Sequence, residues 1–215
     1  MTTISAKPRL RGWLHTGALP VTLVAGFALV ALGPTLQARL ASAIYAITSG
    51  LLFGISATYH RGTLGPRLAE VLRRFDHANI YLIIAGTYTP FALLALDGAA
   101  RVAVLAVIWG GALSGVLFRV FWMSAPRWLY TLLYLALGWT AIFVMPQLLE
   151  GAGVVAVVLV AVGGAFYTAG AIVYGLRRPD PSPGWFGYHE VFHAFTVAAY
   201  VVQYIAVSIV VYSQA

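Results

Sequence analysis

Long, uninterrupted apolar runs constrain this chain more than any other feature of its sequence. There are seven, each close to the roughly 20 residues that an α-helix needs to cross the hydrocarbon core of a bilayer. Charged residues make up 9% of the chain and apolar residues 61%, whereas soluble domains carry about 25% and about 45–50%. The sequence therefore predicts an all-α integral membrane protein. A membrane β-barrel is excluded because its strands would alternate apolar and polar residues.

The apolar runs predict a single domain over residues 1–215, folded as a seven-transmembrane helix bundle. Glycine and proline punctuate the gaps between the runs, as expected for loops. The spans are expected at residues 16–32, 40–59, 79–96, 102–121, 128–145, 154–174 and 189–212.

Basic residues fall almost entirely in alternate loops. Eleven of the 13 Lys and Arg side chains precede the first span or follow the second, fourth and sixth, whereas Arg39 and Arg101 lie in other loops. The positive-inside rule then places the N-terminus in the cytoplasm and the C-terminus outside. The net charge of +7 is explained by this topology and by anionic lipid headgroups as partners, not by nucleic acid. The expected location is the cell membrane, which in a bacterium is the inner membrane.

A short helix is predicted on the cytoplasmic surface, at about residues 64–75. Gly65-Pro66 can start a helix. Leu68, Leu72 and Phe75 then fall on one face at helical spacing, with arginines mostly elsewhere. This pattern is typical of an amphipathic helix that lies in the membrane interface.

The few ionisable side chains that remain at the ends of the spans are predicted to meet at one level of the membrane. Span two ends at the cytoplasmic face with His60, and span three starts there near Asp76. Span seven starts there with His189 and His193. Ionisable groups at membrane depth are costly and usually functional. Because the chain has no cysteine, thiolate ligands and disulfides are excluded.

These residues predict a zinc site. His189 and His193 are four residues apart, share one helix face and can bind one metal ion, and His60 can supply a third nitrogen. Three neutral imidazoles and a water form a tetrahedral zinc site with one open position. Asp76 is expected beside that water. Ser56 lies one turn before His60, where its hydroxyl can hydrogen-bond the water or a substrate oxygen.

Residues 189–193 also match the HExxH motif of zinc proteases, with Glu190 as the base. An intramembrane protease of this type would take a third ligand near Asp97. The predicted topology puts Asp97 at the outer face, about 30 Å from the histidines, so the protease hypothesis is disfavoured. His15 and His77 are expected to face the lipid headgroups instead of the site.

The arrangement Ser56-x-x-x-His60, then Asp76, then His189-x-x-x-His193 resembles the hemolysin III family. This family belongs to the progestin and adiponectin receptor group, within a superfamily that includes alkaline ceramidases. The resemblance implies seven helices with the N-terminus inside, zinc held by the three histidines, and Asp76 near a zinc-bound water. It is carried by residues 56–60 (SATYH), 76–78 (DHA), 84–91 (IAGTYTPF) and 188–193 (YHEVFH).

The resemblance to ceramidases implies zinc-dependent hydrolysis of a membrane lipid amide or ester, with Asp76 accepting a proton and Ser56 positioning the substrate. Two alternatives stay open: a non-enzymatic, zinc-stabilised sensor or regulator of the membrane, and a pore-forming cytolysin, as the family name suggests. This sequence departs from the family before the first span. Where members often carry an acidic residue and an asparagine, it has Lys7, Arg9 and Arg11.

Overall fold

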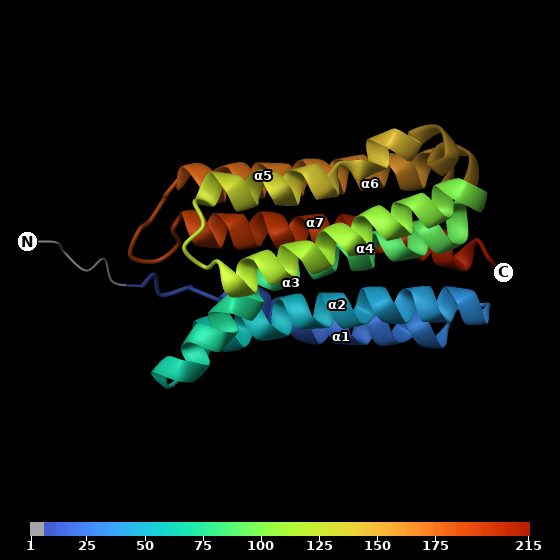
Figure 1. Cartoon of the computed structure of the whole chain (residues 1–215). Helices are drawn as coiled ribbons and strands as arrows, with labels where there is room; N and C mark the ends of the chain where they lie inside the picture. The colour runs from blue at the N-terminus through green and yellow to red at the C-terminus, as the bar shows by residue number, and fades with distance from the viewer. Residues whose placement is uncertain (1–6) are drawn as a thin grey trace, which may run out of the picture.

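The computed structural model describes residues 7–215, and this part of the chain is helical, without β-strands. Its helices lie side by side in an elongated bundle (Figure 1). They are α1 (Trp13–Ala31), α2 (Leu36–Arg61), α3 (Pro66–Ala95), α4 (Gly98–Phe121), α5 (Arg127–Gly138), the 3₁₀-helix η1 (Thr140–Val144), α6 (Met145–Leu176) and α7 (Tyr188–Tyr212).

Six helical segments of the described chain are long and apolar enough to cross a membrane. Five of them are α1 to α4 and α7, and the sixth is the continuous segment Arg127–Leu176, which contains α5, η1 and α6. Gly153 interrupts α6 with φ 78° and ψ 162°, a conformation that glycine adopts without strain. Figure 1 shows α5 and α6 lying side by side. The predicted spans 128–145 and 154–174 therefore fall on either side of this bend.

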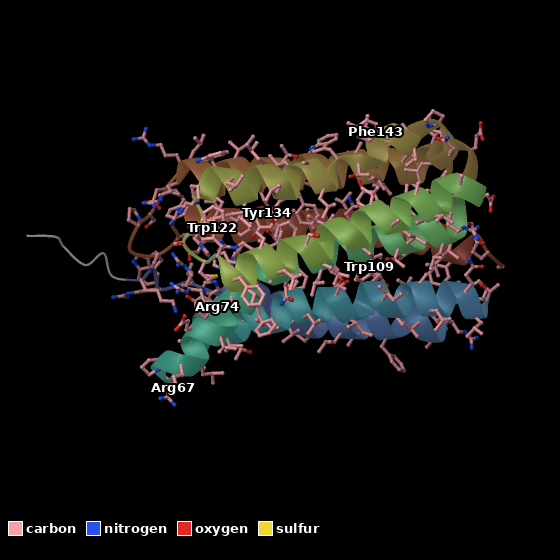
Figure 2. The ribbon with its side chains drawn as sticks, viewed as in Figure 1. Arg67, Arg74, Trp109, Trp122, Tyr134 and Phe143 are labelled. Carbon is pink, nitrogen blue, oxygen red and sulfur yellow. The ribbon has the colours of Figure 1, made fainter. Side chains whose placement is uncertain are left out.

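Large apolar side chains cover the outside of the bundle. Val24, Phe27, Phe121 and Phe143 are 71%, 74%, 81% and 84% exposed. Figure 2 shows Phe143 at the outer edge of the bundle. A soluble monomer does not expose apolar surface on this scale, whereas lipid-facing helices do. The chain is thus a multi-pass cell membrane protein.

Small residues let the helices approach closely, as is common in membranes. A Cβ added to Gly86 of α3 would lie 1.9 Å from Thr48 Oγ1 of α2. Thr48 itself donates to the carbonyls of Ile44 and Tyr45 at 3.0 Å, so its polarity is satisfied within α2. This tight contact holds the second half of α2 against α3, which brings two of the predicted site helices together.

The short helix predicted over residues 64–75 is the first part of α3, not a separate element. Pro66 occupies the first turn, and the short helix runs on into the membrane span because no glycine or proline interrupts residues 67–85; the helix then continues past Gly86 and Pro90 to Ala95. Its start extends beyond the rest of the bundle, with Arg67 near the tip (Figures 1 and 2). Leu68 and Phe75 are 51% and 44% exposed on this extension.

Candidate metal centre

Three histidines from two distant parts of the sequence converge at one end of the bundle. His60 lies in the last turn of α2, and His189 and His193 lie in the first two turns of α7. One ring nitrogen from each lies within 4.8 Å of the other two, and the Nε2 atoms of His60 and His189 are 3.2 Å apart. Two zinc–nitrogen bonds of about 2.0–2.1 Å at a tetrahedral angle place their nitrogens about 3.3 Å apart. The three side chains therefore lie close enough to hold one metal ion.

The donor set also fits a metal chemically. His193 is 2% exposed, and its Nδ1 has no hydrogen-bond partner among the described residues. A buried polar atom without a partner destabilises a fold by about 1–3 kcal/mol, so it is rarely retained without a use. Neutral imidazoles are ligands for zinc, copper, iron and nickel. The geometry thus supports a metal-binding cluster without identifying the ion.

Asp76 and Ser56 lie beside this cluster. Asp76 Oδ2 is 3.6 Å from His60 Nε2, the same nitrogen that faces His189. Ser56 is 2% exposed and lies next to the Asp76 carboxylate, and both residues line one cavity. Within residues 7–215, the group that can share one ion comprises the three histidines. The structure therefore brings all five predicted site residues together, with Asp76 adjacent to the three nitrogens.

A fourth histidine, His15 of α1, packs against the cluster. Its ring stacks on that of His193 with centroids 3.7 Å and planes 9° apart, and it meets Phe53 edge-on at 5.0 Å. His15 is 3% exposed, and neither ring nitrogen has a hydrogen-bond partner in the described structure. The prediction that His15 faces the headgroups is wrong. Sequence spacing gives no signal for it, because its contacts lie on α2 and α7.

His77 is also turned inward. Its Nδ1 lies 2.8 Å from the carbonyl oxygen of Arg73, and its Nε2 lies 3.3 Å from the hydroxyl of Tyr174 on α6. Tyr134 of α5 donates to the His77 carbonyl at 3.1 Å. His77 therefore joins α3 to α5 and α6, and the expectation that it faces the headgroups is not met.

The segment before α1, residues 7–12, crosses the same end of the bundle, and we call it the N-terminal strap. The backbone N–H groups of Arg9 and Leu10 donate to the carbonyls of Gly184 and Trp185 at 3.0 and 3.1 Å. The Arg9 guanidinium also lies 4.5 Å above the Trp185 ring. The strap thereby connects the start of α1 to the loop that precedes α7.

The strap also contacts the ligand on α2. Lys7 Nζ donates to the His60 carbonyl at 2.5 Å. Gly12 has φ 82°, and a Cβ there would lie 2.6 Å from His60 Cβ, so both its conformation and the close contact require glycine. Partial burial, and then the positive charges of Arg11 and Arg61, lower the pKa of the Lys7 ammonium. Positive charge is therefore concentrated around this end.

Glu190 is bound by the strap and does not join the metal ligands. It is 1% exposed, its Oε1 accepts a hydrogen bond from Arg11 Nε, and its Oε2 accepts the N–H of Gly187 at 2.8 Å, which caps α7. Asp97, the other element of the protease hypothesis, precedes α4 at the far end and its side chain is 97% exposed. The structure therefore gives the HExxH pattern no protease geometry.

A long apolar cavity begins at the histidines and continues between the helices toward the opposite end. Asp76 and His193 line one end of it, and Leu96 and Leu148 line the other. The space between its lining atoms is about 1570 Å³ when the open solvent at the mouth is included, and the centre of a water-sized sphere can reach about 150 Å³ of it. Its walls are mostly apolar, with polar groups concentrated at the histidine end, which is the usual composition of a site for an apolar ligand.

Comparison with known proteins agrees with the motifs at this site. The sequence matches the family described as Haemolysin-III related over residues 4–204. It is 34% identical over 152 residues to a Hemolysin-3 homolog from Bacillus subtilis (strain 168), which covers 69% of this chain and 67% of that protein. It is also 34% identical over 140 residues to Hemolysin-3 from Bacillus cereus, which covers 65% of this chain and 64%, slightly under two thirds, of that protein. The family match confirms the resemblance in the motifs: the chain belongs to the haemolysin-III related family.

Proposed function

We propose that this protein binds zinc and hydrolyses an amide or ester bond of a membrane lipid. One observation carries the proposal: three histidines and Asp76 meet at the end of a long apolar cavity inside a bundle of membrane helices. Zinc is the proposed ion because three protein ligands and one open position are typical of its catalytic sites.

The residues around the centre suit such a reaction. A zinc ion bound there supplies Lewis acidity and lowers the pKa of a coordinated water to about 7. Asp76 Oδ2 is placed to accept a proton from the attacking water, because it faces the same His60 nitrogen as His189 does. The buried hydroxyl of Ser56 orients that carboxylate or donates to a substrate oxygen. The apolar cavity holds the acyl chain and so brings the carbonyl to the histidines.

We further propose seven membrane crossings, with the histidine end in the cytoplasm. The bend at Gly153 supports the count, because it divides Arg127–Leu176 into two segments that lie side by side (Figure 1). The basic strap and the arginines of the α3 extension gather at the histidine end, which the positive-inside rule assigns to the cytoplasm. Arg67 and Arg73 are then placed to contact anionic headgroups of the inner leaflet, whereas Arg74 is bonded to Glu70 and to the Val120 carbonyl.

Metal analysis of purified protein tests the centre. Wild-type protein should carry about one zinc per chain, and His193→Ala should lose it because only two imidazoles remain. His77→Gln is the matched control, since His77 is a neighbouring inward-facing histidine outside the ligand group, and it should retain zinc. Equal metal in wild type and His193→Ala would contradict the proposal.

Lipid turnover tests the reaction. Asp76→Asn should retain the metal but form product from membrane lipid extracts about 10²–10⁴-fold more slowly, the usual contribution of a general base. Unchanged turnover would exclude Asp76 as the base. Bound zinc without any lipid product would support the non-enzymatic sensor. The names of the two relatives refer to haemolysis, so erythrocyte lysis by the purified protein is the assay for the cytolysin alternative.

A further inference from the structure

Two polar side chains face the cavity far from the histidines, and each has a buried atom without a partner in the described structure. Gln203 of α7 is 5% exposed, and its Nε2 donates to the Val160 carbonyl at 3.2 Å while its Oε1 has no partner. The hydroxyl of Tyr167 on α6 is also buried without a partner. Both residues line the cavity. Two such atoms in one apolar cavity indicate a binding subsite, because leaving each unsatisfied is unfavourable.

The packing around Gln203 fixes its amide in place. A Cβ added to Gly163 of α6 would lie 2.7, 2.8 and 2.9 Å from Nε2, Cγ and Cδ of Gln203, so the amide rests directly on the α6 backbone. Tyr167 is four residues after Gly163 and thus on the same face of α6, one turn closer to the histidines. Val157 and Ala171, which also line the cavity from α6, are apolar. Thr168, which lines the same stretch of wall, already donates to the Gly164 carbonyl at 2.7 Å, whereas Tyr167 and Gln203 each keep an atom without a partner in the described structure.

The depth of the pair can be obtained from helix geometry. Gln203 follows His193 by ten residues on one helix, which places it about 15 Å further into the cavity. Because α6 runs antiparallel to α7 and Gly163 meets Gln203, Tyr167 lies about 6 Å nearer the histidines. Carbon–carbon bonds of about 1.5 Å at tetrahedral angles advance an extended chain about 1.25 Å each. The pair therefore flanks roughly the eighth to thirteenth carbon of a chain whose first carbon lies at the histidines.

We propose that Tyr167 and Gln203 form a second binding subsite, which recognises a hydroxyl group in the middle of the acyl chain. Gln203 Oε1 accepts the hydrogen bond of that hydroxyl, and the Tyr167 hydroxyl donates to its oxygen. This inference rests on the proposed function only in that the carboxyl end of the ligand lies at the histidines. A plain alkyl chain would leave both protein atoms unsatisfied, so the subsite selects mid-chain hydroxylated acyl groups over unmodified ones.

Competition binding tests the subsite without requiring turnover. The metal-loaded protein in lipid nanodiscs is incubated with radiolabelled stearic acid, which is displaced by unlabelled stearic, 12-hydroxystearic or 2-hydroxystearic acid. One or two additional hydrogen bonds predict that 12-hydroxystearic acid binds about 3- to 10-fold more tightly than stearic acid. The 2-hydroxy acid carries its hydroxyl near the histidines, away from the subsite. Its affinity relative to stearic acid should therefore be the same in wild type and in the subsite variants.

Variants locate the preference. Gln203→Leu and Tyr167→Phe should each reduce the advantage of the 12-hydroxy acid toward onefold, while binding of stearic acid is retained. Thr196→Val is the matched control, because Thr196 lines the same cavity but its hydroxyl already donates to the Phe192 carbonyl at 3.0 Å. The control should keep the wild-type preference.

Each remaining outcome is decisive. Equal affinity for stearic and 12-hydroxystearic acid in wild type would overturn the subsite and leave buried water as the partner of these atoms. A preference lost in Thr196→Val but not in Gln203→Leu would overturn its location. Failure of the zinc or hydrolysis tests together with a preference removed by Gln203→Leu would leave the subsite standing and refute only the proposed reaction.

Discussion

Two ion pairs at opposite ends of the bundle, Arg11–Glu190 and Arg101–Asp97, differ in almost every respect. At the histidine end, Arg11 pairs with Glu190, which is 1% exposed and far away in the sequence. At the opposite end, Arg101 pairs with Asp97 at 2.8 Å, one helical turn away, and the Asp97 side chain is 97% exposed. Exposed local pairs contribute about 0–1 kcal/mol, whereas a buried charge that loses its partner destabilises a fold by several times that amount.

The histidine end also contains buried ionisable side chains, among them His15, His60 and His193. The strap, the start of α1, the end of α2 and the start of α7 meet through polar contacts between residues remote in sequence. The opposite end also has contacts between distant residues, such as Gln37 Nε2 donating to the Leu93 carbonyl at 2.8 Å, but its ion pair is local and exposed. Buried ionisable side chains are costly in a membrane protein, so the presence of Glu190 and the buried histidines at one end marks the end where function is expected.

Removal of metal should have the largest effect on this contrast. A ligand present at about 1,000 times its dissociation constant stabilises the folded state by about 4 kcal/mol, and in a chain of this size each kcal/mol shifts Tm by about 2–4 °C. Chelation should therefore lower the Tm of wild-type protein by about 8–16 °C and leave His193→Ala unaffected. Hydrogen exchange should increase at the first turns of α7 and not at its last turns. Uniform loosening of both ends would remove the contrast.

Breaking the two ion pairs should give unequal losses. Arg11→Met leaves the Glu190 carboxylate buried and should destabilise the protein by about 2–3 kcal/mol, somewhat below the value for a fully buried pair because Arg11 is 19% exposed. Arg101→Met is the matched change at the other end and should cost less than about 1 kcal/mol. Thermal unfolding in one detergent measures both. Equal losses would show that burial does not distinguish the ends.

His15→Phe should have the smallest effect on stability, although His15 is buried at the histidine end. Phenylalanine keeps the stacking on His193 and removes two ring nitrogens that have no partner in the described structure. Zinc content should stay unchanged. Removal of the two nitrogens stabilises the fold and the larger phenyl ring in a packed site destabilises it, so the net change in stability should be less than about 1 kcal/mol. Zinc content and Tm, measured on the same preparation, test both expectations. Loss of zinc in this variant would make His15 part of the metal centre.

The membrane helices could be predicted from the sequence because lipid requires continuous apolar surface over a fixed length. Span seven, expected at 189–212, is α7 at Tyr188–Tyr212. The fifth span, expected at 128–145, is less regular, since α5 ends at Gly138 and a 3₁₀-helix follows. Its geometry depends on tertiary contacts such as Trp139 Nε1 donating to Thr168 Oγ1 at 3.1 Å, which no local pattern reveals.

The candidate site divides in the same way. His189 and His193 were predictable because their spacing defines one helix face, and His60 and Asp76 followed from topology. The inward position of His15 and the Gln203 amide could not be predicted, since each depends on how α1 or α6 packs against α7. The basic residues of the strap indicated orientation, but nothing in their pattern predicted that Arg11 would bind Glu190.

The strap has a practical consequence for anyone producing this protein. Because Arg9 and Leu10 are hydrogen-bonded to the loop before α7, and Arg11 to Glu190 of α7 itself, a bulky fusion before Lys7 is expected to disturb the histidine cluster. An affinity tag or fluorescent reporter is better placed after Ala215, at the end of the bundle opposite the histidines (Figure 1).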